Sequence, residues 1–568
     1  SQNEHFHWLD CTCPYVKKIH RIAEQNCAPD RCFILMGTAD HPEVVGIMSY
    51  FEGEKYVFEI VYPSVRASSL NFELTDNDLE KYKNKLVELK SLFGNSEGVG
   101  ADEFKDALYK LLSFMARIET QRDIAQLRYY CDMSNSAAWD DYLYAYEAYD
   151  EAHGLFWAFY NESKSAENEL SRAFVDVVQR EFGDSMISVT PSTDSYAYEM
   201  ELLEKEYNSL KNSNASDERM FEVYKDYLVA ADGYATSVHT SNYYEYSSKH
   251  RYYRGDTPVQ RKALRRYVKK YLVPLYKKLA LKSQVFDAGL SGAEYTLSNK
   301  YLGARYDSFD ENYLADYFSS LPKSAANAML GAFEKDRVLI GSKSGAYNHA
   351  MLYHAGNTPI CYFHKDQAVL ETMAHEIGHY YAAVVSDNEC HAYDLKETQS
   401  TANTALMYSY LSSKLDTKAI RSAELYSLSN WVYQVICSVI KDEFDEIIFT
   451  RDPSALTLAD FDRIMSELID EYGVGSLTGS IRNQLMTYWR RLGIVYPTSN
   501  YCYATAGIAA LQIYMKSKTD YSAACEIYRR IVEEPQDDGN FLSTIVNAGL
   551  TSPYDEQTYV KLQKLAET

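Results

Sequence analysis

Glycine and proline, the residues that most often end a helix, are scarce in this sequence of 568 residues. Its 25 glycines and 13 prolines make up about 4% and 2% of the chain, against a typical usage of roughly 7% and 5%. Apolar side chains also recur at helical spacing, for example at Leu79, Tyr82, Leu86 and Leu89, and Gly94 follows as a C-terminal stop. The sequence therefore predicts a mainly α-helical protein.

Two segments depart from this helical pattern. Residues 32–62 alternate between apolar and polar side chains and are rich in β-branched residues. Residues 338–364 have the pattern of short extended segments, which are separated by Gly341, Gly345 and Gly356. We expect a small β-containing N-terminal region at residues 1–75, and strands just before the histidine-containing segment described below.

The charge balance of the chain limits its partners. Its 57 lysines and arginines against 80 aspartates and glutamates give a formal net charge of −23 at pH 7. Such an excess of negative charge repels a phosphate backbone, so we do not expect a nucleic acid as a partner. No run approaches the ~18 consecutive apolar residues of a membrane span, and the mean hydropathy is −0.39. A soluble chain without a membrane span is expected.

Four of the ten cysteines lie close to the N-terminus, at Cys11, Cys13, Cys27 and Cys32. Paired disulfides of an exported protein and free thiols of an intracellular one both agree with this cluster. The first residue is Ser1 instead of methionine, which allows a removed leader but does not identify one. The compartment is left open by these residues.

The most informative segment is residues 371–381, which contain His375, Glu376 and His379 in a His-Glu-x-x-His pattern. Two histidines four residues apart on a helix lie on one face, one turn apart, so both imidazoles can bind one metal ion. Glu376 sits beside them, where its carboxylate can take a proton from a water on that ion. The pattern predicts a catalytic zinc centre.

A catalytic zinc usually takes three protein ligands, so a third ligand is needed nearby. Residues 386–388 carry a turn signal, Ser-Asp-Asn. A second helix that begins near His391 would run back antiparallel to the first and bring Glu397 level with His379. His391 is the alternative ligand, although it would lie near the turn, about 9 Å from the imidazoles. We favour Glu397.

Four segments of the chain resemble the M3 family of zinc oligopeptidases, in particular its oligoendopeptidase F branch. The family's His-Glu-Leu-Gly-His core is similar to residues 375–379, and its Glu-x-x-Ser-Thr segment to residues 397–401. Its Lys-x-Gly-Ala-Tyr segment is similar to residues 343–347, and its tyrosine-rich Tyr-Ala-Thr-Gly segment to residues 501–507. A histidine that the family places shortly before these tyrosines is missing from residues 489–496.

The resemblance implies a two-lobed helical metallopeptidase with a deep central groove and one Zn²⁺ per chain. Residues 76–255 would form the N-terminal helical lobe, and residues 256–568 the zinc peptidase catalytic domain. Gly345, Ala346 and Tyr347 would hold the main chain of a peptide substrate by strand addition, with Tyr501 as a further substrate-binding residue. The resemblance also favours a cytoplasmic protein, whereas the cysteine cluster leaves export open.

Together these features predict a metalloendopeptidase that hydrolyses internal bonds of short, unstructured peptides. Glu376 would act as the general base, and the negative charge that develops on the carbonyl oxygen needs hydrogen-bond donors. Phenol hydroxyls are neutral at pH 7 and suit this role, so we assign it to Tyr503 and Tyr496. Two alternatives remain, a metallocarboxypeptidase-type exopeptidase on the same ligands and a peptide-binding protein with degraded catalysis. The oligomeric state is not predicted.

Overall fold

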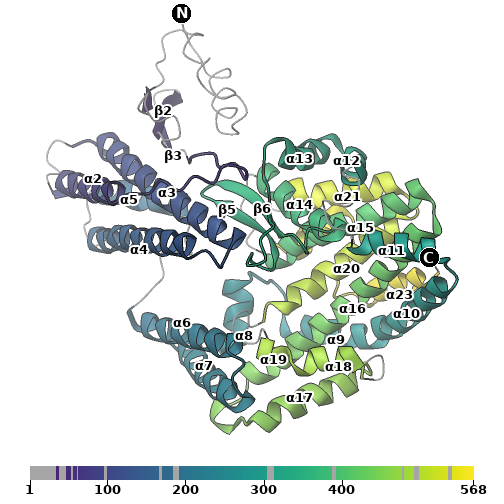
Figure 1. Cartoon of the computed structure of the whole chain (residues 1–568). Coiled ribbons are helices and arrows are strands. Elements are labelled where there is room, and N and C mark those ends of the chain that lie inside the picture. Colours follow the sequence, from purple (N-terminus) through teal and green to yellow (C-terminus); the bar gives the residue numbers. More distant parts are fainter. Residues whose placement is uncertain are drawn as a thin grey trace, which may run out of the picture. The chain divides into compact units, whose positions relative to one another are not determined.

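The computed structural model describes residues 34–36, 47–52, 55–60, 62–94, 99–164, 169–182, 191–303, 312–386, 392–475, 479–491, 498–534 and 540–567. Its contacts divide the chain into two compact units. The first consists of Ser1–Ser188 and Phe333–Lys365, and the second of Val189–Ala332 and Asp366–Thr568. Both units are built mainly from helices (Figure 1). This confirms the mainly α-helical fold class with a small β part.

Long helices form the core of the first unit. They are α2 (Asp76–Gly94), α3 (Ala101–Cys131), α4 (Ser136–Lys164) and α5 (Glu169–Phe182). Their apolar faces meet at buried side chains such as Phe104, Phe156 and Phe174. The start of α2 is fixed by Asp78, whose carboxylate accepts hydrogen bonds from the N–H and the hydroxyl of Thr75.

The described part of the first unit also contains two small sheets. In one, β1 (Ile34–Met36), β2 (Ile47–Glu52) and β3 (Lys55–Ile60) are antiparallel. In the other, β6 (Thr358–His364) lies between β4 (Val338–Gly341), to which it is parallel, and β5 (Ala350–Ala355), to which it is antiparallel. Ile360 and Tyr362 of β6 are buried in a cluster with Ile124 and Leu127 of α3. Strands thus occur in both segments where they were expected.

The core of the second unit is made by α15 (Tyr393–Leu415), α16 (Lys418–Phe449) and α20 (Asn500–Ser517), which pack on one another. α14 (Leu370–Val385) packs on α15. Leu406, Ile436 and Ile508 have no exposed surface between these helices. The other helices and helical turns of this unit are α6 (Pro191–Asn212), α7 (Asp217–Ser237), α8 (Tyr243–Tyr246), the π-helical turn Ser247–Arg251, α9 (Pro258–Tyr267), the π-helical turn Val268–Leu272, α10 (Val273–Ala288), α11 (Gly292–Gly303), α12 (Asn312–Ser319), α13 (Lys323–Glu334), the 3₁₀ turn Pro453–Ala455, α17 (Leu458–Glu471), α18 (Gly479–Met486), α19 (Tyr488–Arg491), α21 (Tyr521–Glu533), α22 (Phe541–Ala548), α23 (Glu556–Leu562) and the 3₁₀ turn Gln563–Ala566.

The two units are divided at residues other than the expected boundaries, 75 and 255. α6 to α8 were expected in the N-terminal helical lobe but lie in the second unit, where the Tyr207 hydroxyl donates to the Trp489 carbonyl and the Tyr244 hydroxyl to Asp442. Strands β4 to β6 were expected in the catalytic domain but lie in the first unit, because β6 packs on α3. These contacts join residues far apart in the sequence, which a local pattern does not indicate.

Two further expectations concern the surroundings of the chain. None of the helices in the described ranges combines the length and the apolar character of a bilayer-spanning segment. Cys11, Cys13, Cys27 and Cys32 lie outside the described residues, so their pairing stays open.

Candidate metal centre

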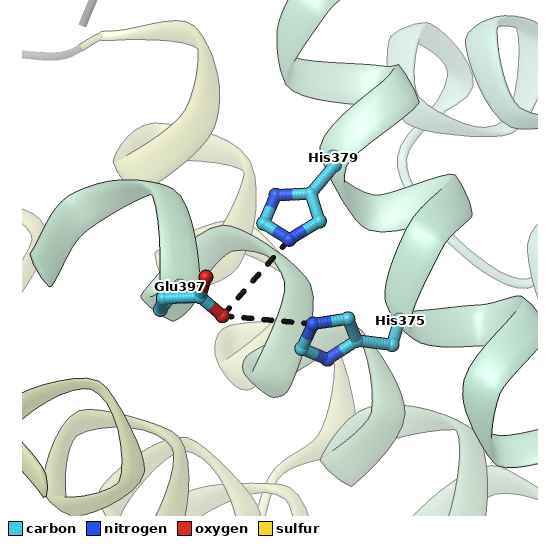
Figure 2. Close-up of side chains that lie close together, drawn as sticks. All are labelled: His375, His379 and Glu397. Carbon is cyan, nitrogen blue, oxygen red and sulfur yellow. Dashed lines mark ion pairs between the residues drawn. The ribbon is translucent and has the colours of Figure 1, made fainter. Parts of the chain in front are cut away.

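Three candidate ligands meet where α14 packs on α15 (Figure 2). His375 and His379 come from α14, one turn apart, and Glu397 comes from the second turn of α15. The Nε2 atoms of His375 and His379 lie 3.6 Å and 4.0 Å from Oε2 of Glu397. One ligand atom from each residue lies within 4.8 Å of the other two. The structure therefore brings together the three residues that the sequence nominated.

The chemistry of this donor set fits a zinc ion. Zinc takes imidazole nitrogens and carboxylate oxygens at about 2.0–2.2 Å in a tetrahedral arrangement, which separates the ligand atoms by roughly 3.4 Å. The separations of the two imidazole nitrogens from Glu397, 3.6 Å and 4.0 Å, are near that value. In addition, Oε2 of Glu397 is buried and has no hydrogen-bond partner, and such an atom is costly unless a cation or a donor faces it. The residues present thus fit a metal with one open coordination position.

Burial and neighbouring charges shift the pKa of each of the three groups. Burial lowers the pKa of His379 to about 4, so its imidazole is neutral at pH 7 and keeps a free lone pair. Burial also opposes charge on His375, but the neighbouring carboxylates of Glu397, Glu376 and Glu371 outweigh burial and raise its pKa. Burial works against a charged Glu397, yet the two histidines lower its pKa. The carboxylate is therefore ionised at neutral pH.

Hydrogen bonds from neighbouring helices fix α14 in place. The side-chain amide of Asn403 on α15 donates to the carbonyl oxygen of Ala374 at 2.6 Å, directly before His375. The hydroxyl of Tyr317 on α12 donates in turn to Oδ1 of Asn403 at 2.6 Å. One ligand-bearing helix is thus tied to the other through buried groups, which holds the imidazoles at the level of Glu397.

Glu371 is a second anchor that the sequence reasoning missed. It lies one turn before His375 on the same face of α14, and the indole Nε1 of Trp431 on α16 donates to its carboxylate at 3.0 Å. Burial raises its pKa, and the donors Trp431 and Ser427 oppose that rise. The four-residue spacing before His375 was the available signal, since residues i and i+4 share a helix face.

Glu376 is buried, with 7% of its surface exposed. Its negative charge contributes to the raised pKa of His375 and also to that of Tyr503. The charge of Glu376 therefore acts both on a candidate ligand and on the α20 tyrosine. This is the neighbourhood in which a general base for an attacking water is needed.

Tyr503, in the first turn of α20, is electrostatically coupled to Glu397. The charge of Glu397, followed by burial, raises the pKa of Tyr503 well above its usual value, and Tyr503 in turn helps to lower the pKa of Glu397. The residue is 46% exposed, so its ring also faces solvent. A protonated hydroxyl beside the candidate ligands can donate a hydrogen bond to a bound group.

The other nominated tyrosines are placed differently. Tyr501 has no exposed surface, and the guanidinium of Arg254 lies 4.9 Å from the centre of its ring. It therefore offers no surface to a substrate in this structure. Tyr496 lies outside the described residues, as does the rival ligand His391.

Gly345, Ala346 and Tyr347 belong to the first unit, in the loop between β4 and β5. The carbonyl oxygen of Gly345 accepts a hydrogen bond from the Met133 N–H, and the Tyr347 N–H donates to the Tyr130 carbonyl oxygen, both at 2.8 Å. The rings of Tyr347 and Tyr130 stack with centroids 4.5 Å apart. The loop is thus fastened to the end of α3, which occupies part of its main-chain hydrogen-bonding capacity.

The chain has the fold of several solved peptidases. PZ peptidase A matches with a TM-score of 0.64 and 16% identity, over 88% of this chain and 99% of the other. A putative oligoendopeptidase F from Bacillus anthracis matches with a TM-score of 0.61 and 14% identity, over 89% and 98%. Metallocarboxypeptidase 1 from Trypanosoma cruzi matches with a TM-score of 0.51 and 10% identity, over 86% and 99%. At such low identity the likeness shows the fold alone.

The N-terminal part of the chain is similar to a different family. A family model described as LytB protein matches residues 1–125. The 4-hydroxy-3-methylbut-2-enyl diphosphate reductase of Geotalea uraniireducens is 45% identical over 49 residues, which are 9% of this chain and 17% of that protein. The enzyme of Thermotoga maritima is 25% identical over 126 residues, 22% of this chain and 42% of the relative. The chain thus spans less than half the length of these relatives, and the family-model match ends before the candidate metal centre.

Proposed function

We propose that this chain is a zinc-dependent metalloendopeptidase that hydrolyses internal bonds of short, unstructured peptides. The observation that carries the proposal is the convergence of His375, His379 and Glu397 at one point, with the unpartnered Oε2 atom of Glu397 between the two imidazoles. The fold shared with PZ peptidase A and oligoendopeptidase F supports it independently.

His375, His379 and Glu397 would hold the ion. A zinc ion so bound supplies a Lewis acid and lowers the pKa of a water on it towards about 7. Three protein ligands leave one tetrahedral position open, as in catalytic sites. A structural zinc site would need a fourth protein ligand, and the candidate cluster found among the described residues has three members.

Glu376 is the residue that would move the proton. Its carboxylate follows His375 directly in α14 and is buried near the ligands. It would accept a proton as water attacks the peptide carbonyl carbon, and then donate that proton to the leaving amine as the C–N bond breaks. A protein that only binds peptides gains nothing from a buried carboxylate at this place.

Tyr503 would stabilise the negative charge on the carbonyl oxygen. Its hydroxyl is protonated at neutral pH because Glu397 and burial raise its pKa. A donor held by a helix beside the ligands needs no reorganisation during the reaction, which makes it effective. Gly345, Ala346 and Tyr347 would hold the substrate main chain, and Tyr496 is the alternative donor to the carbonyl oxygen.

An exopeptidase is the second candidate. It is favoured by one specific observation, the likeness in fold to the Trypanosoma cruzi metallocarboxypeptidase 1. The same ligands and base would serve either reaction, since the two differ in which bond of the peptide lies at the metal. The distinction therefore depends on the substrate's C-terminus and not on the ligand set.

Cleavage of internally quenched peptides tests the proposal. A series of about 5 to 20 residues, each with a free or an amidated C-terminus, is incubated with purified protein of measured zinc content, and products are identified by mass. An endopeptidase cuts internal bonds and also cleaves the peptides with an amidated C-terminus. A carboxypeptidase releases single C-terminal residues and does not cleave the amidated peptides. Glu376→Gln protein is the control for a contaminating peptidase. Zinc-loaded protein that cleaves none of the series contradicts the proposal.

A further inference from the structure

Arg254 is an almost completely buried arginine outside the candidate metal centre. Its side chain is 1% exposed, and it lies between the π-helical turn Ser247–Arg251 and α9. Its Nε lies 3.7 Å from Oδ2 of Asp394 on α15, and its Nη1 lies 3.9 Å from Oδ1 of Asp442 on α16. Its Nη2 donates to the carbonyl oxygen of Thr498, just before α20. One guanidinium thus contacts three core helices or their ends.

The contact with α15 is made next to the candidate ligand. Asp394 lies in the first turn of α15, three residues before Glu397. Its Oδ1 accepts a hydrogen bond from the hydroxyl of Thr505 on α20, and Thr505 lies two residues after Tyr503. The Asp394 carboxylate therefore joins Arg254, the start of α15 and the start of α20.

The contact with α20 is made at a residue with an unusual backbone. Thr498 is fully buried and has a φ of +67°, a left-handed conformation that a β-branched residue adopts only when its surroundings impose it. Its N–H donates to Oδ2 of Asp445 and its hydroxyl to Ser247, both at 2.9 Å. With Arg254 on its carbonyl, all its polar groups are held. This fixes where α20 begins.

A ring contact adds to the hold on α20. The guanidinium of Arg254 lies over the buried ring of Tyr501, 4.9 Å from its centre, and over the ring of Tyr252 at 5.3 Å. Tyr501 lies two residues before Tyr503 in the same turn of helix. A planar guanidinium can stack on a ring and bind carbonyl and carboxylate oxygens in its plane at once, which an ammonium group cannot do.

We propose that Arg254 is a positioning residue, which sets the spacing between the Glu397 carboxylate and the Tyr503 hydroxyl by holding the first turns of α15 and α20 on one side chain. A contribution of Arg254 to the reaction rate rests on the proposed peptidase function. The spacing between the two side chains, in contrast, is a property of the folded chain.

Arg261 provides a matched control. Its side chain is also 1% exposed, and its guanidinium lies over a buried ring, that of Tyr244, at 5.3 Å. Its hydrogen bonds go to Asp256 and Glu245, which lie outside α15 and α20. Arg254→Met and Arg261→Met each remove one buried guanidinium, so both are expected to destabilise the fold. Only the first should change the spacing.

A fluorine label at position 503 measures the spacing without metal or turnover. 3-Fluorotyrosine is incorporated at Tyr503 in the full chain, and its ¹⁹F resonance is recorded in metal-free protein with and without Glu397→Gln. In the parent, Glu397→Gln should shift the resonance because the charge of that carboxylate acts on the Tyr503 phenol. In Arg254→Met protein, the shift caused by Glu397→Gln should fall to less than a third of its parent value. In Arg261→Met protein it should stay near the parent value. A full shift in Arg254→Met, or no shift in the parent, overturns the proposal.

Kinetics on one peptide give the second readout. If Arg254 acts through Tyr503, Arg254→Met should lower kcat about tenfold in the parent but less than threefold in Tyr503→Phe protein, because coupled residues are not additive. If the kcat losses of the two single variants multiply in the double variant, the proposal is overturned. Should Arg254→Met fail to fold, as judged by thermal melting, Asp394→Asn replaces it, since the amide can still accept from Thr505 but loses its charge towards Arg254. A chain without peptidase activity would disprove the proposed function, while the fluorine experiment would still decide the spacing.

Discussion

The backbone of Gly378 lies so close to Ser400 that a Cβ atom at position 378 would be 2.8 Å from the Ser400 Cα. It would also lie 3.0 Å from the carbonyl oxygen of Gln399. Both neighbours are backbone atoms of α15, which cannot rotate away as a side chain does. Glycine therefore lets α14 and α15 approach at the level of His379, and this approach brings Glu397 within reach of both imidazoles.

Gly378→Ala should destabilise the fold by about 1–3 kcal/mol, the usual cost of overpacking. It should also weaken zinc binding, because the two helices must move apart. Gly154→Ala is the control: it lies inside α4, where a Cβ meets nothing within 4 Å, so the change should stabilise by roughly 0.5–1 kcal/mol. Urea denaturation of metal-free protein and a chelator competition assay measure the two effects. Equal stability of both variants would contradict the close approach.

The helical fold class and the nominated ligands could be predicted because they depend on local rules. Two histidines four residues apart share a helix face, and a short turn after His379 forces the next helix to return past it with Glu397. Arg254, in contrast, lies about 140 residues from Asp394 and about 240 from Thr498 in the sequence. Nothing local indicates that one guanidinium meets both. The unit boundaries differed for the same reason, since β6 packs on α3 across an interval of more than 200 residues.

Removal of one proposed ligand should remove the metal. Purified parent protein should contain about one zinc per chain, and Glu397→Ala should lose most of it, because two histidines alone do not make a catalytic zinc site. His391→Ala should keep its zinc. Elemental analysis after gel filtration gives the answer, and a reversed result for these two variants would exchange the ligand assignment.

Glu376→Gln should separate binding from chemistry. The amide keeps the size of the side chain but cannot accept the proton of an attacking water, so kcat should fall about 10²–10⁴-fold. Zinc content and melting temperature should stay close to those of the parent. Activity within tenfold of the parent, measured on one quenched peptide, would show that another group takes the proton.

Asp445 should make the stability of the fold depend on pH. Burial raises its pKa to about 8, whereas an unfolded aspartate has a pKa of about 3.9. The folded state therefore keeps a proton that the unfolded state has already released, and the free energy of unfolding falls as pH rises from about 4 to about 8. Asp445→Asn should abolish this fall in the free energy of unfolding, because asparagine does not titrate. Its side-chain oxygen can still accept the hydrogen bond from the Thr498 N–H.

The test compares the free energies of unfolding, measured by urea denaturation, at pH 5, 6.5 and 8. The difference between Asp445→Asn and the parent should move in favour of the variant as pH rises, by an amount on the order of a few kcal/mol. Asp226→Asn, at an exposed position of α7, should run parallel to the parent. A difference for Asp445→Asn that stays constant with pH would rule out a raised pKa.

Tyr503→Phe should lower kcat with little change in KM. The phenol is protonated at neutral pH, since its pKa lies well above the usual value, so it can donate to a carbonyl oxygen whose negative charge develops only in the transition state. Loss of one such donor costs roughly 10²–10³-fold in rate, or about 3–4 kcal/mol. The ring volume is preserved, so the melting temperature should change little.

Tyr501→Phe is the matched control, since this residue lies two positions earlier in α20 and its ring is buried under Arg254. Removal of its hydroxyl should leave kcat within about threefold of the parent, because a packing tyrosine contributes its ring and not a donor to the reaction. Tyr496→Phe completes the set. If Tyr503→Phe also stays within threefold and Tyr496→Phe loses 10²-fold or more, the donor role passes to Tyr496. If all three variants keep their rate, the carbonyl oxygen is stabilised by a group other than these tyrosines.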